Sequence, residues 1–67
     1  MLGIKFLSAL SPGDRVEVYG KRHLLWRGYV ETIAPELGIF WIQTDAFERR
    51  LLDLDEHNVF RLRPEDT

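Results

Sequence analysis

The chain has 67 residues, enough for one domain with a single core. A domain of this size buries only about 60% of the surface that its unfolded chain exposes. The absence of cysteine excludes disulfide bonds and thiolate metal sites. Nine basic and eleven acidic residues give a formal net charge of -2, which does not favour non-specific binding to phosphate groups.

Residues 1–10 are largely apolar, with Lys5 as their one charged side chain. This segment lacks a charged n-region and a clear small-residue cleavage site, and it is too short to span a bilayer. We therefore expect no signal peptide, no association with a membrane and a cytoplasmic location. The run Ser11-Pro12-Gly13-Asp14 then supplies turn residues. Residues 1–12 are thus predicted to form an ordered arm that packs on the domain or on a neighbouring subunit.

The following residues carry the pattern of short β-strands. Apolar and polar residues alternate over residues 15–19, which is typical of a half-buried strand. In the next predicted strand, residues 24–33, the inward side is Trp26, Gly28 and Val30. A glycine inside a strand indicates a sharp bend or a close approach of two backbones, so Gly28 is predicted to mark one.

Three further strands are expected, and they complete an all-β domain. They cover residues 39–44, 48–54 and 59–62. The predicted architecture is a five-stranded SH3-like barrel over residues 13–63, preceded by the apolar arm and followed by a tail at residues 64–67.

The strand at residues 39–44 is apolar on both faces. Phe40 and Ile42 lie on one face, and Ile39 and Trp41 lie on the other. A small barrel has only one interior, so the outer of these faces needs a cover. The candidates are the arm, a second copy of the chain, or a ligand. We predict that the arm covers it, within the chain or across a subunit boundary; if the arm is a free tail, Trp41 becomes the leading ligand contact.

Two sets of residues are candidates for binding a partner. The predicted protein-interaction surface consists of Ile39, Trp41, Tyr29 and Tyr19. The alternative is a nucleic-acid site formed by the basic residues Lys21, Arg22, Arg27, Arg49 and Arg50. The simpler interpretation of these basic residues is that they are solvated charges on loops and strand edges.

Motifs for catalysis or metal binding are lacking. His23 and His57 are far apart in the sequence, and their spacing does not resemble a ligand set. Asp53 and Asp55 lie on one face of a predicted strand, and a surface role is the simpler interpretation of this pair. We expect no catalytic residue, no bound metal and no cofactor.

The strand order and the entrance motif Gly13-Asp14-Arg15-Val16 resemble SH3-like barrels. Residues 13–33 are similar to the KOW pattern of ribosomal proteins and transcription elongation factors, which implies binding to RNA or protein. The aromatic residues invite comparison with Tudor-like domains, whose aromatic cages hold methylated side chains by cation–π attraction. They are Tyr19, Tyr29, Trp41 and Phe47.

The chain also resembles the plasmid-type (type II) dihydrofolate reductases, which are SH3-like barrels that assemble as tetramers around a pore. The resemblance rests on Gly13-Asp14-Arg15-Val16, Trp26-Arg27-Gly28 and Val59-Phe60-Arg61-Leu62. That family lines its pore with a Val-Gln-Ile-Tyr run, whereas this chain has Leu51-Leu52-Asp53-Leu54. The resemblance therefore implies the fold and oligomerisation, and no catalytic residue is carried over.

The sequence favours a small binding or assembly module that associates with itself or with another protein. The alternatives are a KOW-like module that binds nucleic acid and, third, a pore-forming oligomeric enzyme of the reductase kind.

Overall fold

The computed structural model describes residues 2–66, which fold into one antiparallel sheet. The strands are β1 (Leu2–Ile4), β2 (Arg15–Tyr19), β3 (Leu24–Ala34), β4 (Ile39–Thr44), β5 (Arg49–Asp53) and β6 (Asn58–Arg61). Three short 3₁₀ turns join or follow them: η1 (Leu7–Ala9), η2 (Pro35–Leu37) and η3 (Pro64–Asp66). The described residues contain no α-helix, so the predicted all-β class is confirmed.

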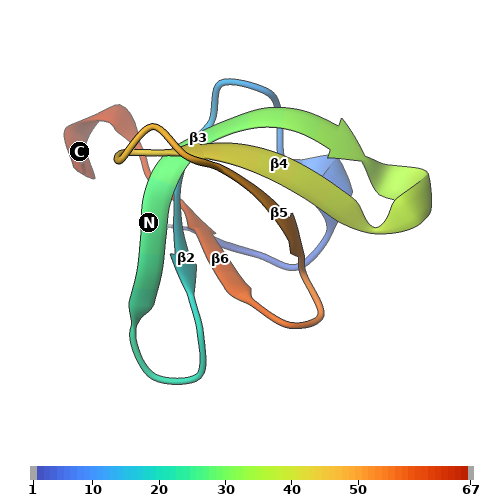
Figure 1. The fold of residues 1–67 in the computed structure, drawn as a ribbon, viewed down its shortest axis with the longest axis horizontal. Helices are drawn as coiled ribbons and strands as arrows, with labels where there is room; N and C mark the ends of the chain where they lie inside the picture. The colour runs from blue at the N-terminus through green and yellow to red at the C-terminus, as the bar shows by residue number, and fades with distance from the viewer. Residues whose placement is uncertain (1, 67) are drawn as a thin grey trace.

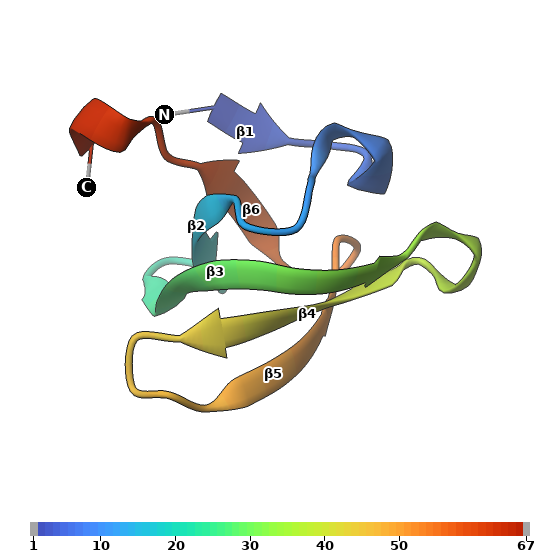
Figure 2. The same cartoon turned by 90° about the horizontal axis from the view of Figure 1, so that it is seen from above.

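The sheet has six strands in the order β1-β6-β2-β3-β4-β5, and it is strongly bent (Figures 1 and 2). The prediction of a closed, five-stranded barrel is therefore wrong in both strand number and closure. Residues 2–4 add a strand because they pair with β6 in register, Leu2 opposite Arg61 and Ile4 opposite Val59. β1 thus occupies the free side of β6, and among the described strands β5 pairs with β4 alone.

The core lies on the concave side of the sheet and takes side chains from every strand. Its centre consists of valines on β2, β3 and β6 and of Phe40 and Ile42 on β4, all at most 2% exposed. Leu52, Ile4 and Leu10 complete the buried cluster. Alternation along β4 therefore sends Phe40 and Ile42 inward and leaves Ile39 and Trp41 on the convex side, which we call the outer face.

Two positions in β3 distinguish its pairing with β4 from that of a regular strand. Gly28 is buried against β4, and a Cβ atom added there would lie 2.1 Å from the carbonyl oxygen of Gln43. This confirms the predicted close approach of backbones. Three residues later the register shifts between Val30 and Thr32, which leaves Glu31 as a bulge.

The arm contributes to the core and does not cover the outer face of β4. Ile4 and Leu10 are buried in the core, and Leu7 packs against it. Leu2 and Phe6 remain 54% and 71% exposed. Within one chain, the predicted cover over Ile39 and Trp41 is therefore wrong: β1 pairs with β6, and residues 5–8 line a hollow with Pro35, Gly38, Leu54 and Asp55. A cover across a subunit boundary stays a prediction.

Candidate interaction surface

The outer face carries an apolar row at the β5 edge of the sheet. Trp41 on β4 lies opposite Leu51 on β5, and Ile39 lies opposite Asp53. Ile39 and Trp41 are half-buried, whereas Leu51 is 49% exposed. We call Ile39, Trp41 and Leu51 the outer apolar row. Ile39 and Trp41 are the part of the predicted interaction surface that the structure brings together. Leu51 was not predicted, although the alternation over residues 48–54 could have indicated it.

A charged pair borders the row. The guanidinium carbon of Arg49 lies 4.4 Å from the centroid of the Trp41 ring. The Nε of the same side chain donates a 2.6 Å hydrogen bond to Oε1 of Glu31, the bulged residue of β3. Arg49 therefore shields one side of Trp41 from water by a cation–π contact and leaves Leu51 exposed.

The two tyrosines of the predicted surface lie in different places. Tyr29, on β3, is 52% exposed, and the guanidinium of Arg15 lies 4.9 Å from its ring centroid. Tyr19 lies at the other end of β2 from Arg15 and packs edge-on against Phe60, with 5.5 Å between ring centroids. Tyr19, Tyr29 and Trp41 therefore each contact a different neighbour.

Tyr19 belongs to a polar cluster on the outer face of β2 and β3. Glu17 is only 3% exposed, and it accepts hydrogen bonds from Nε of Arg27 at 2.6 Å and from the hydroxyl of Tyr19 at 3.2 Å. Burial, together with the nearby Glu17 carboxylate, raises the pKa of Tyr19. The buried carboxylate is thus neutralised by a cross-strand arginine, which is the usual condition for burying a charge.

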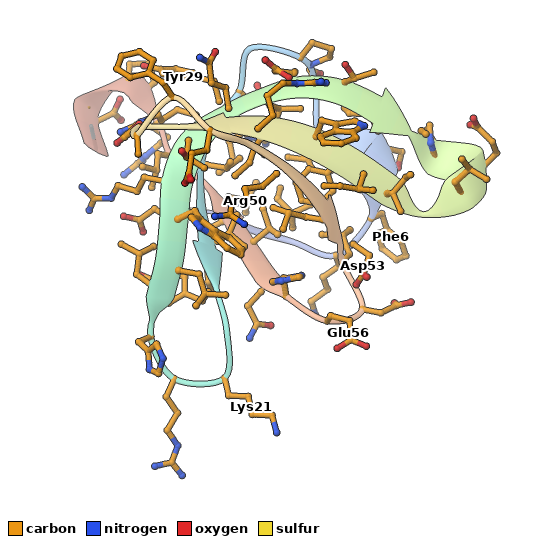
Figure 3. All side chains as sticks on the ribbon, viewed as in Figure 1. Phe6, Lys21, Tyr29, Arg50, Asp53 and Glu56 are labelled. Carbon is orange, nitrogen blue, oxygen red and sulfur yellow. The ribbon has the colours of Figure 1, made fainter. Side chains whose placement is uncertain are left out.

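The residues of the predicted nucleic-acid site are dispersed. Arg27, Arg49 and Arg50 each contact a carboxylate, at 2.6, 2.6 and 3.4 Å. Arg50 also lies 5.1 Å from the ring centroid of Trp26. Lys21, beside Arg22 in the β2–β3 loop, points away from the molecule at a distance from Arg50 (Figure 3).

A shallow groove that sequence reasoning missed lies beside Tyr29. It has a volume of about 490 Å³, and its lining includes Arg15 and Arg61. Arg15 donates from Nη2 to Oδ2 of Asp45 at 2.8 Å, and this hydrogen bond lowers the pKa of the Asp45 carboxyl. Arg61 donates to the carbonyl oxygen of Ala9 at 2.6 Å and lies 3.7 Å from Asp14. The ion pairs join residues far apart in the chain, so no local sequence signal could have revealed them.

Asp53, one residue of the predicted acidic pair, has a structural contact. Oδ1 of Asp53 accepts a 2.7 Å hydrogen bond from the backbone N–H of Glu56, so this carboxylate caps the turn after β5 (Figure 3). Among the side chains that the structure describes, at residues 2–65, no three histidine or acidic groups gather where they could hold a metal ion. No helix in this part of the chain is long and apolar enough to cross a membrane.

Comparison with known families, curated proteins and solved structures gave no match.

Proposed function

We propose that this protein is a small assembly module that associates with itself through the outer apolar row. The observation that carries the proposal is the position of Leu51. A leucine that is 49% exposed on an edge strand, next to Trp41, extends an apolar surface to the border of the sheet. Apolar surface on an open sheet edge favours association, because pairing buries side chains and satisfies free backbone groups together.

The proposed fold family is the SH3-like group, to which KOW and Tudor modules belong. Its support is the short, strongly bent antiparallel sheet, with a turn before its last strand and the entrance motif at residues 13–16. Binding of nucleic acid has weaker support. Arg27, Arg49 and Arg50 contact carboxylates, and the net charge is -2.

The test is the molar mass in solution as a function of protein concentration, measured by sedimentation or light scattering. The unmodified protein is expected to increase in mass with concentration, and Leu51→Ser is expected to remain monomeric over the same range. Leu2→Ser is the matched control, because Leu2 is 54% exposed on the strand at the opposite edge of the sheet. It should associate like the unmodified protein.

A constant monomer mass in the unmodified protein would contradict the proposal. Equal loss of association in both serine variants would show that the outer apolar row is not the surface. A salt-sensitive, sub-micromolar affinity for RNA or DNA would replace self-association with the nucleic-acid function.

A further inference from the structure

The free edge of β5 has a defined set of backbone groups that point away from β4. The N–H of Thr44 donates to the carbonyl oxygen of Glu48 at 2.7 Å, and this bond fixes the phase of the β4–β5 ladder. In an antiparallel ladder, alternate residues turn their backbone groups towards the partner strand. Arg50 and Leu52 therefore bond to β4, whereas the N–H and C=O groups of Arg49, Leu51 and Asp53 point to the free edge.

The side chains of these same three residues lie together on the outer face. Along the strand they read basic, apolar and acidic: Arg49, Leu51 and Asp53. This order is self-complementary. If a second β5 strand runs antiparallel about a two-fold axis at Leu51, each Arg49 lies opposite Asp53 of the partner subunit, and the two leucines lie opposite each other.

We propose that a second copy of this chain pairs with β5 in that register, which joins the two sheets edge to edge. The proposal rests on the self-association proposed above and specifies its geometry. The outer apolar row then continues across the axis, from Trp41 through Leu51 to the partner subunit's Leu51 and the partner subunit's Trp41. Edge pairing covers Leu51, and the backbone groups at the free edge form hydrogen bonds to the partner strand. The opposite charges of Arg49 and Asp53 fix the register.

Other registers are less favourable. The two-fold axis can lie only where the outward backbone groups of Arg49, Leu51 and Asp53 still face the partner strand. An axis at Arg50 or at Leu52 sets a charged side chain opposite Leu51 and leaves the charges without cross-strand partners within residues 49–53. The axis at Leu51 is therefore the register in which both charges and apolar groups match.

Contacts within the chain limit the paired segment and are compatible with it. Nδ1 of His57 lies 3.0 Å from the carbonyl oxygen of Asp53, so the pairing ends at that residue. The Arg49–Glu31 ion pair is open to water, with 56% of the Arg49 side chain exposed. Exposed ion pairs contribute little to stability, so exchanging Glu31 for the partner subunit's Asp53 as the carboxylate that Arg49 contacts costs little.

Two experiments test the geometry, and the first uses the absence of cysteine from the chain. In Leu51→Cys, any thiol cross-link joins two copies. Directly opposed residues have Cα atoms about 5.5 Å apart, within reach of a disulfide or a short bis-maleimide. We expect an efficient covalent dimer from Leu51→Cys. Leu2→Cys and Gln43→Cys, which lie on the opposite edge strand and one strand in from the edge, should give little.

The second experiment is a charge exchange. Arg49→Asp and Asp53→Arg each place two like-charge pairs across the axis of their own dimer, so each variant alone should dimerise about tenfold more weakly. An equimolar mixture has opposite charges at both positions and should recover the dimer. Circular dichroism checks that each variant is folded, because Asp53 also caps the turn at Glu56.

The outcomes separate the geometry from self-association itself. A protein that stays monomeric at every concentration overturns both proposals. If the protein dimerises, but Leu51→Cys gives no cross-link and the charge-exchange mixture shows no recovery, self-association is retained and pairing of β5 with β5 is overturned. Cross-linking of Leu51→Cys to Leu2→Cys in a mixture overturns it in favour of head-to-tail association between β5 and β1.

Discussion

Gly28 shows how one missing side chain determines the shape of the sheet. The strand pattern around it favours a β-branched residue, yet a Cβ at this position would meet the backbone of Gln43 and Thr44 at 2.1–2.9 Å. β3 and β4 can approach this closely only because the side chain is absent. The same position lies opposite both Val16 and Thr44, so β2 and β4 meet β3 at this point.

Gly28→Ala is expected to lower the free energy of unfolding by about 1–3 kcal/mol, as overpacking of a rigid site does. Gly3→Ala is the matched control, because its Cβ would meet only the Phe60 ring, at an ordinary 3.5 Å. It should be neutral or raise the free energy of unfolding by about 0.4–1 kcal/mol, because alanine lowers the conformational entropy of the unfolded chain. Chemical denaturation measures both; equal stability of Gly28→Ala and the unmodified protein would contradict the close approach.

Asp45 gives a prediction for pH. The hydrogen bond from Arg15 lowers the pKa of Asp45 below its ordinary value of 3.8. As the pH falls, the unfolded chain binds this proton before the folded chain does, so the ion pair stabilises the protein above about pH 4 and is lost as the pH falls through the folded pKa. Because the Asp45 side chain is 52% exposed, the effect is only about 0.2–1 kcal/mol.

Asp45→Asn should therefore be less stable than the unmodified protein at pH 7, and the two should converge as the pH falls below about 4 and through the lowered pKa of Asp45. Asp55→Asn, on the turn after β5, makes the same change in net charge and serves as the control. Thermal unfolding across this pH range measures the difference. A constant gap between Asp45→Asn and the unmodified protein at all pH values would show that the ion pair does not titrate in this way.

β1 is the element whose role differs most from its sequence pattern. Apolar residues at positions 2, 4, 6 and 7 look alike in the sequence, but the structure buries Ile4 and exposes Phe6. Ile4→Ala should cost about 2–4 kcal/mol of unfolding free energy through the cavity that it leaves. Phe6→Ala removes a larger side chain that is 71% exposed and should cost less than about 0.5 kcal/mol. Similar costs for the two variants would contradict the pairing of β1 with β6.

The strand with strict alternation, at residues 15–19, could be predicted from the sequence and matches β2 residue for residue. Alternation is sufficient there because the strand has one apolar face. The sixth strand could not be predicted, since three residues are too short to show a period. The bulge at Glu31 likewise depends on pairing with Trp41 and Ile42 of another strand, which no local pattern records.

The candidate surface could be predicted only in part, for a similar reason. Ile39 and Trp41 could be predicted because their strand is apolar on both faces. The exposure of Leu51 to a partner could not, because it depends on β5 lying at the edge of the sheet. Arg49 looked like one member of a basic patch. Its stacking on Trp41 and its ion pair with Glu31 depend on which strands are neighbours.

Self-association also affects the stability of the protein as a whole. If the native state is a dimer and the unfolded state is a monomer, mass action stabilises the native state at higher concentration. The melting temperature should therefore rise by several degrees when the protein concentration increases about a hundredfold, because each tenfold step adds about 1.4 kcal/mol per mole of dimer. Leu51→Ser should melt at one temperature regardless of concentration, and a concentration-independent melting temperature in both proteins would contradict association.

The position of β6 between β1 and β2 has a consequence for synthesis on the ribosome. β2 to β5 follow one another as neighbours in the sheet, so each can pair with the previous strand once both have left the exit tunnel. β6 emerges after them and must insert between two earlier strands. Before β6 pairs, the edges of β1 and β2 have no partner strand, and the core lacks the side chains of Val59 and Leu62. The nascent chain therefore completes its fold only after β6 has left the exit tunnel, and the sheet is unfinished until then.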